Sequence, residues 1–233
     1  MSTANNRNIL KNGGPTGFRA VAGQLAQIGR QFHDRQWVLG TSGNFSAVLS
    51  REPLRLAITR TGVDKGTLTA RHIVQVDESG ASVKGSGRPS DETPLHVALV
   101  RACGAGAVLH THSIWATLAS NMHFRRGGLR IKGYEMLKGL RGVCTHEHEE
   151  WLPIIENSQD MARLSRCVEE RLQEHPDAHG FLLRRHGLYT WGTDLGEAKR
   201  HVEILEFLLE VTGRQPDGAA LGLLLEEGKS AVA

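Results

Sequence analysis

The 233-residue sequence has no apolar run long enough to span a bilayer, no secretory signal pattern at its start, and only three cysteines. Cys103, Cys144 and Cys167 are too widely and irregularly spaced for a disulfide framework or a Cys-x-x-Cys metal knuckle. Cys103 and Cys167 fall within helical patterns, where we expect buried free thiols. These absences favour a cytoplasmic protein that neither spans nor binds a membrane.

A strong charge imbalance is also absent. The formal net charge is only +3, and the basic residues are scattered apart from a cluster at Arg125, Arg126, Arg130 and Lys132. Nucleic-acid binding usually requires a basic stripe or a recognisable module, so we expect no nucleic-acid partner. An anionic small substrate is compatible with this balance. Twelve histidines make metal chemistry worth considering.

The hydrophobic patterns predict one α/β domain after a flexible polar tail over residues 1–17. Helices and strands interleave without a strict βαβ rhythm, which favours a mixed or antiparallel sheet. Asp194 and Glu197 form a capping box at the start of the last helix, and a capping residue is expected near Ser90. The predicted helices are 16–34, 90–103, 113–120, 161–172 and 194–213, and the predicted strands are 44–50, 54–60, 72–77, 81–85, 107–112, 151–155, 179–183 and 187–192.

The stretch "AVLHTH" ends a predicted strand with two histidines one residue apart. Side chains alternate along a strand, so His110 and His112 should lie on the same face and could bind one metal ion. A catalytic zinc site needs a third ligand and an open position, and His186 in "RRHG" is the best candidate for that ligand. Alternatively, these are ordinary core or surface histidines.

Two loops are rich in small and hydrogen-bonding residues. "GTSGNFS" and "TRTGVDKG" offer backbone N–H groups and hydroxyls that suit a phosphate or another oxyanion, although a tight turn is the favoured interpretation of the first loop taken alone. The candidate anion-binding residues in these loops are Ser42, Gly43, Asn44, Ser46, Thr61, Gly62 and Lys65.

Two glutamates are candidates for acid/base chemistry. Glu92 starts a helix, where it could simply compensate the helix dipole. Glu135, in "KGYEMLKGL", lies in a partly apolar segment where burial could raise its pKa. In "THEHEE", His146 and His148 could chelate a metal, but a solvated polar edge is the better interpretation because no third ligand is evident.

Five short segments occur together in an order typical of one family. "SGNFS", "TRTG", "PSDE", "HTH" and "RRHG" resemble, in that order, the class II aldolase/adducin family from about Gly17 to Gln215. "GYEMLKG" and "HEHEEWLPIIENSQD" further resemble a subgroup that dehydrates a phosphorylated ketose in methionine salvage. The sequence departs from the family pattern at Asp91, where aldolases often have a second serine, so one phosphate contact is in doubt.

The resemblance implies an α/β/α layered domain over residues 18–215, with a central, mostly antiparallel sheet and a C-terminal tail over 216–233. It implies one zinc ion per subunit, bound by His110, His112 and His186, and a homotetramer with active sites near subunit interfaces. Ser90 joins the loop residues as an expected phosphate ligand.

The implied reaction removes water from 5-methylthioribulose 1-phosphate to give 2,3-diketo-5-methylthiopentyl 1-phosphate. We expect Glu135 to be the acid/base first, because it lies in the subgroup segment, and Glu92 second, because it holds the aldolase acid/base position. Two alternatives are a sugar-phosphate aldolase or epimerase of the same family and a non-catalytic, adducin-like scaffold.

Overall fold

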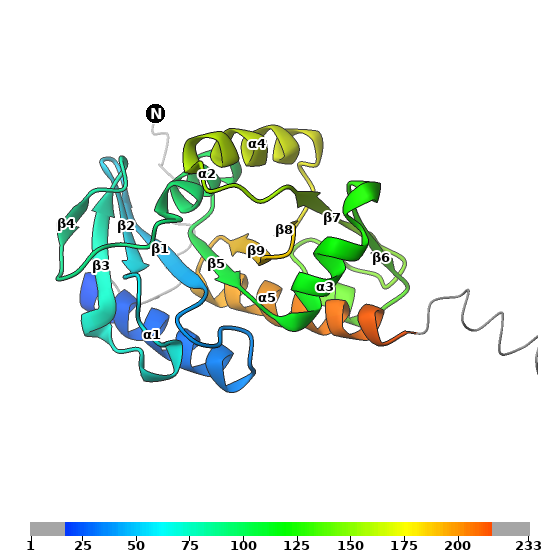
Figure 1. Cartoon of the computed structure of the whole chain (residues 1–233), viewed down its shortest axis with the longest axis horizontal. Coiled ribbons are helices and arrows are strands. Elements are labelled where there is room, and N and C mark those ends of the chain that lie inside the picture. Colours follow the sequence, from blue (N-terminus) through cyan, green and yellow to red (C-terminus); the bar gives the residue numbers. More distant parts are fainter. Residues whose placement is uncertain (1–16, 216–233) are drawn as a thin grey trace, which may run out of the picture.

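The computed structural model describes residues 17–215 and shows a nine-stranded sheet between two layers of helices (Figure 1). The strand order is β4-β3-β2-β1-β5-β9-β8-β7-β6, and every neighbouring pair is antiparallel except β7 with β8. The predicted mostly antiparallel α/β/α fold is therefore confirmed. The strands are β1 Asn44–Arg51, β2 Leu54–Thr59, β3 Ile73–Asp77, β4 Ser82–Lys84, β5 Ala107–Thr111, β6 Gly128–Lys132, β7 Glu149–Ile155, β8 Gly180–Leu183 and β9 Gly187–Gly192.

Helices cover both faces of the sheet (Figure 1). On one face, α2 (Thr93–Cys103) and α4 (Met161–Glu174) pack over β2, β3, β5 and β8 around Leu95, Leu99 and Val168. On the other face lie α1 (Phe18–Asp34), α3 (Ile114–Met122) and α5 (Leu195–Arg214). Burial of these apolar stripes explains why each amphipathic segment folds as a helix against the sheet.

The predicted elements are present, with small shifts at their ends. The Asp194 carboxylate caps α5 by accepting a hydrogen bond from the Glu197 N–H, as predicted. Helix α2 begins later than predicted, at Thr93, and Ser90 Oγ instead accepts a hydrogen bond from the Glu92 N–H. Strand β6 is a difference from the prediction, because its basic residues Arg130 and Lys132 hide the strand pattern within a charge cluster.

Three further predictions concern the terminal tails, the burial of the cysteine thiols and the absence of membrane-spanning segments. The predicted tails lie outside the described residues, apart from Gly17. Cys103 and Cys167 are only half-buried, Cys144 is exposed, and all three thiols are free. Within residues 17–215, no helix is both long and apolar enough to cross a membrane.

Candidate metal centre

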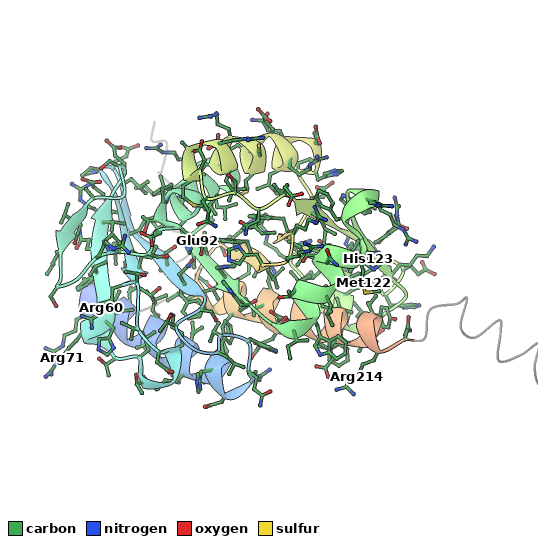
Figure 2. All side chains as sticks on the ribbon, in the orientation of Figure 1. Arg60, Arg71, Glu92, Met122, His123 and Arg214 are labelled. Atoms are coloured by element: carbon green, nitrogen blue, oxygen red, sulfur yellow. The ribbon has the colours of Figure 1, made fainter. Side chains whose placement is uncertain are left out.

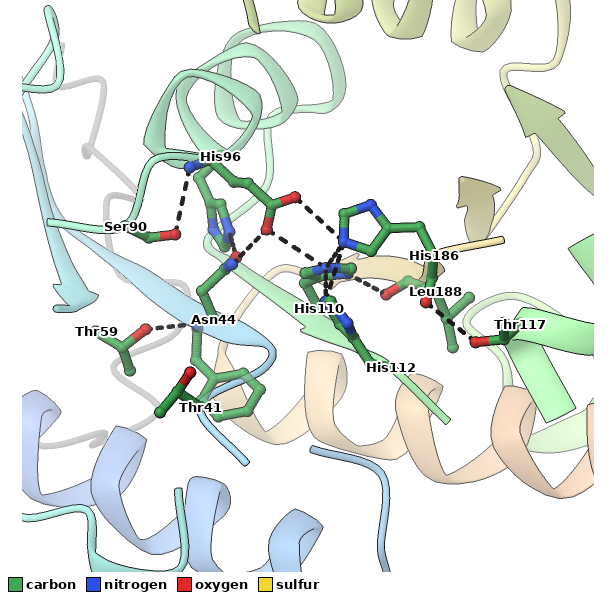
Figure 3. A network of polar contacts seen from close by, with 12 residues as sticks. Thr41, Asn44, Thr59, Ser90, His96, His110, His112, Thr117, His186 and Leu188 are labelled. Atoms are coloured by element: carbon green, nitrogen blue, oxygen red, sulfur yellow. Dashed lines mark hydrogen bonds and ion pairs between the residues drawn. The ribbon is translucent and has the colours of Figure 1, made fainter. Parts of the chain in front are cut away.

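Three histidine side chains converge at the end of β5 (Figure 3). His110 and His112 lie on the same side of the strand, as predicted, with their Nε2 atoms 2.7 Å apart. The Nε2 atom of His186 lies 3.3 Å from that of His110 and 3.0 Å from that of His112. The structure thus brings together the three residues that the sequence nominated as metal ligands.

His186 reaches this point from the tight turn between β8 and β9. Arg185, the residue before it, has a left-handed backbone with φ 55°, and its N–H donates to Ser120 Oγ on α3 at 2.8 Å. Gly187, the residue after it, packs directly on β5, since a Cβ there would lie 1.9 Å from the Thr111 carbonyl oxygen. A glycine is therefore required for β9 to approach β5 closely enough to deliver His186.

The surroundings of the three imidazoles favour their neutral forms. Burial is the main cause that lowers the pKa of His110, His112 and His186, and the neighbouring imidazoles lower those of His110 and His112 further. The Leu188 carbonyl oxygen lies 2.9 Å from His110 Nδ1, which places the proton on Nδ1 and leaves Nε2 as an acceptor. Converging unprotonated Nε2 atoms, each bearing a lone pair, are the donor set that a divalent metal requires.

Glu92 completes the group from the start of α2. Its Oε2 lies 3.4 Å from His110 Nε2, and its Oε1 lies 3.5 Å from His186 Nε2. One ligand atom from each of the four residues lies within 4.8 Å of the others. A three-histidine, one-glutamate group of this kind could hold a metal ion.

A buried chain of hydrogen bonds fixes the Glu92 carboxylate, and the sequence analysis missed most of it. Asn44 donates from Nδ2 to Glu92 Oε2 at 2.5 Å, so its Oδ1 faces His96 Nε2, also at 2.5 Å. His96 must donate that bond, and its Nδ1 accepts from Ser46 Oγ at 2.7 Å. Burial lowers the pKa of His96 to about 4, consistent with a neutral ring. The spacing of Glu92 and His96, one turn apart on α2, was the available signal.

The ring of Tyr189 packs against the ring of His110, the first of the three histidines. Its ring stacks on His110 with a centroid distance of 3.9 Å, because His110 and Tyr189 are cross-strand neighbours in β5 and β9. Burial and the Glu92 carboxylate raise the pKa of Tyr189, so its phenol stays neutral. Its other face stacks on Phe181. These contacts leave His110 little freedom to rotate.

A cavity of about 250 Å³ opens in front of the group. A larger cavity of about 670 Å³ lies elsewhere and does not border the three histidines. Gly62 is absent from the lining of the smaller cavity, although Thr61 beside it is present. The lining residues are Thr41, Ser42, Gly43, Asn44, Arg60, Thr61, Lys65, Ser90, Asp91, Glu92, His112, Asn157, Gln159, Met161 and His186.

Two cationic side chains, Arg60 and Lys65, line this cavity. Arg60 was not predicted from the sequence as a site residue. Lys65 is almost fully buried, and its Nζ donates to the carbonyl oxygens of Thr41 and Val63, both at 3.0 Å. Desolvation by burial lowers the pKa of Lys65 to about 8. The cavity therefore brings hydrogen-bond donors and positive charge together with the histidine group.

Glu135 is not where the sequence analysis expected it. It begins a short 3₁₀ helix, η4 (Glu135–Gly139), and its side chain is 71% exposed rather than buried. A hydrogen bond from Lys138 Nζ at 2.5 Å lowers the pKa of Glu135, the opposite of the predicted direction. The flanking glycines and apolar residues were misleading, because Leu137 and Leu140 point inward while Glu135 points to solvent.

The "THEHEE" segment differs from its predicted solvated edge. His146 is exposed, but His148, Glu150 and His179 form a second compact group. The third member, His179, lies just before β8 and is remote in sequence from the other two. The absence of a nearby third ligand in the sequence was therefore not evidence against a cluster.

Comparisons with known proteins agree with this geometry. Residues 23–212 match the family model "Class II Aldolase and Adducin N-terminal domain". The chain is 43% identical over 195 residues to a methylthioribulose-1-phosphate dehydratase of Sorangium cellulosum, covering 83% of this chain and 91% of that protein. It is 42% identical over 200 residues to the protein of that name from Methylococcus capsulatus, covering 85% and 96%.

Solved structures share the fold. YgbL from Escherichia coli superposes with a TM-score of 0.70 at 25% identity, over 85% of this chain and 92% of that one. L-fuculose-1-phosphate aldolase from Thermus thermophilus gives a TM-score of 0.65 at 24% identity, over 83% and 94%. The latter likeness concerns the fold alone.

Proposed function

This chain belongs to the class II aldolase and adducin family, and we propose that it dehydrates 5-methylthioribulose 1-phosphate to 2,3-diketo-5-methylthiopentyl 1-phosphate in methionine salvage. The observation that carries the proposal is the three-histidine, one-glutamate group beside a cavity lined by hydroxyls, amides and two cations. This arrangement occurs in a chain that is 43% and 42% identical in sequence to two methylthioribulose-1-phosphate dehydratases. Such a cavity suits a small substrate with a phosphate at one end and adjacent oxygens at the other.

His110, His112 and His186 would hold a divalent metal, and we propose zinc because three neutral imidazoles suit it. When bound, zinc supplies a Lewis acid that stabilises negative charge on the substrate oxygens next to the reacting carbon. The chain contributes the orientation of these ligands. Leu188 fixes the tautomer of His110, and Tyr189 fixes the plane of its ring.

Within one chain, Glu92 is the group placed to move the proton. Its carboxylate is 15% exposed, borders the cavity and is held by Asn44. In the proposed reaction a carboxylate removes the proton at C3, which is acidic because C2 is a ketone. The C4 hydroxyl then leaves with that proton as water, and the enol product becomes the diketone.

The phosphate would bind to the hydroxyl and cationic side chains that line the cavity. Ser42, Thr61 and Ser90 present hydroxyls there, and Arg60 and Lys65 supply positive charge. Both polar atoms of the Asn44 side chain already have partners, so we assign Asn44 to Glu92 rather than to phosphate. Gly43 serves by its lack of a side chain, since a Cβ there would lie 2.7 Å from the His110 carbonyl oxygen.

Glu135 is exposed and does not line this cavity, so we propose that a second copy of the chain presents it there. We propose such an assembly, a homotetramer. The exposed side chains Ile114, Leu118 and Met122 form an apolar stripe along α3, which begins two residues after His112. In this proposal Glu92 acts in the cavity of its own chain, and Glu135 acts in the cavity of a neighbouring chain.

A complementation experiment separates the two glutamates. Glu135→Gln and His112→Ala chains, each inactive alone, are coexpressed with different tags. If Glu135 acts across an interface, random assembly restores about a quarter of wild-type activity. Coexpressed Glu92→Gln and His112→Ala chains are the matched control and should stay inactive, because both residues act in one site.

The test of the function itself is reaction of the zinc-loaded protein with 5-methylthioribulose 1-phosphate, with products followed by NMR and mass spectrometry. Loss of water to a diketone phosphate is expected. Two smaller fragments would instead indicate an aldolase, and an epimeric ketose phosphate an epimerase. Lack of turnover with any ketose phosphate would favour a scaffold, although such a protein has no need for an intact metal group.

A further inference from the structure

We propose that His148, Glu150 and His179 form a second divalent-metal site, separate from the group on β5. His148 and Glu150 flank the first residue of β7, and His179 directly precedes β8, the parallel neighbour of β7 (Figure 1). Within residues 17–215, two groups of at least three His, Cys, Asp or Glu residues have ligand atoms within 4.8 Å of one another, and this is the second.

The donor atoms already converge. Glu150 Oε2 lies 2.9 Å from His148 Nε2 and 2.9 Å from His179 Nδ1. The Nε2 atoms of the first group are 2.7 to 3.3 Å apart, so the two groups have similar spacing. Two imidazoles and one carboxylate are a common ligand set for zinc, and also for other divalent transition metals.

Glu150 and His179 each make a further hydrogen bond that holds the side chain in place. Glu150 is buried, and its Oε1 accepts the backbone N–H of His179 at 3.0 Å. His179 directs its other nitrogen, Nε2, to the Arg141 carbonyl oxygen at 2.8 Å. A ring nitrogen that donates to a carbonyl while the other faces a ligand position is the usual arrangement of a metal-binding histidine.

Both ring nitrogens of His179 face oxygen acceptors, Nδ1 the Glu150 carboxylate and Nε2 the Arg141 carbonyl. A divalent cation would replace the Nδ1 proton and satisfy Glu150 and His148 at the same time.

An open coordination position is available. His148 and His179 line a cavity of about 670 Å³, together with Arg141, His175 and His201. His148 is 29% exposed, so solvent and metal can reach the group from its side. The metal would tie the segment after η4 to the starts of β7 and β8, since His179 Nε2 already contacts the Arg141 carbonyl oxygen at 2.8 Å.

The test is the number of zinc ions bound by the full chain, after metal removal and incubation with ZnCl₂ alone. We expect two ions per wild-type chain, one in His112→Ala, one in His148→Ala and none in the double variant. His148→Gln keeps a hydrogen-bond donor near Glu150 and so preserves folding, yet it should also lose one ion. The exposed neighbour His146 provides the control, and His146→Ala should bind two.

One ion in the wild type that disappears in His112→Ala and persists in His148→Ala would overturn the proposal and leave a hydrogen-bonded network. A second ion insensitive to both changes at His148 would also overturn it. Neither result touches the proposed dehydratase, which depends on the first group. Conversely, loss of dehydratase activity with normal zinc binding at His148 would leave the second site intact.

Discussion

Asn44 lies between His96 and Glu92 and hydrogen-bonds both, its amide nitrogen to the carboxylate and its oxygen to the imidazole. In β1 it is also the cross-strand neighbour of His110. Asn44 thereby connects α2, which begins directly after the proposed base Glu92, with β5, which carries the first metal ligand His110. Loss of this amide should therefore disturb chemistry more than substrate binding.

We expect Asn44→Ala to lower kcat about 10²-fold while KM changes little, because the Glu92 carboxylate loses its orienting donor. Steady-state kinetics on 5-methylthioribulose 1-phosphate measure the split. Asn157→Ala, which removes an amide that lines the same cavity, is the control. A rise in KM with normal kcat would instead assign Asn44 to the phosphate.

We expect removal of zinc by a chelator to abolish activity and readdition of zinc to restore it. His112→Ala should not recover, because two imidazoles remain where three are needed. His72→Ala, a histidine outside both groups, should behave as the wild type. Full activity of the metal-free protein would exclude a catalytic metal.

We expect Arg60→Ala to raise KM about 10-fold or more, since a hydrogen bond to a charged group contributes roughly 1.5–3 kcal/mol. Arg71→Ala provides a matched control, because Arg71 lies at the edge of the molecule and does not line the cavity (Figure 2). Inhibition by inorganic phosphate should weaken in parallel in Arg60→Ala. Unchanged phosphate inhibition would place the phosphate elsewhere.

Glu206, buried on α5, accepts a hydrogen bond from Thr111 Oγ1, and burial raises its pKa from 4.5 to about 7. The folded state therefore retains a proton that the unfolded state loses, and this contribution to stability falls as pH rises from about 4.5 to 7. Glu206→Gln should be the more stable protein above pH 7, by up to about 3 kcal/mol. Urea unfolding at pH 5 and pH 8 measures the difference.

The control for that experiment is Glu203→Gln, which loses only ion pairs with Arg35 and Lys199 at the surface. Its effect should stay below about 1 kcal/mol at both pH values. An equal response of the two variants to pH would show that Glu206 has an ordinary pKa.

We expect Leu118→Glu to convert the assembly into smaller species in sedimentation velocity, because it places a charge in the apolar stripe on α3. Val83→Glu is a closely matched control, since both side chains belong to residues that are 47% exposed. A protein that is already monomeric without substitution would contradict the tetramer and the proposed role of Glu135 together.

Strand and helix periodicity predicted nearly the whole fold, and one-residue alternation placed His110 and His112 on the same face. The supporting contacts were harder to predict. His96 reads as an ordinary residue of an amphipathic helix until Asn44 is seen beside it. Similarly, His179 joins Glu150 only because β7 and β8 pair in parallel after an intervening helix. Such contacts depend on strand pairing between distant segments, which local patterns do not encode.

The first metal group has a consequence for folding equilibria. His110 and His186 are 76 residues apart in the sequence, and they meet only after β5 pairs with β9 across Gly187. A metal that needs all three imidazoles binds the folded chain and not the unfolded one. At a free zinc concentration 1,000 times the dissociation constant, this linkage stabilises the fold by about 4 kcal/mol. With the proposed zinc bound, the folded fraction of the protein in the cell would rise with zinc supply, and scarcity of the ion would lower that fraction as well as the activity.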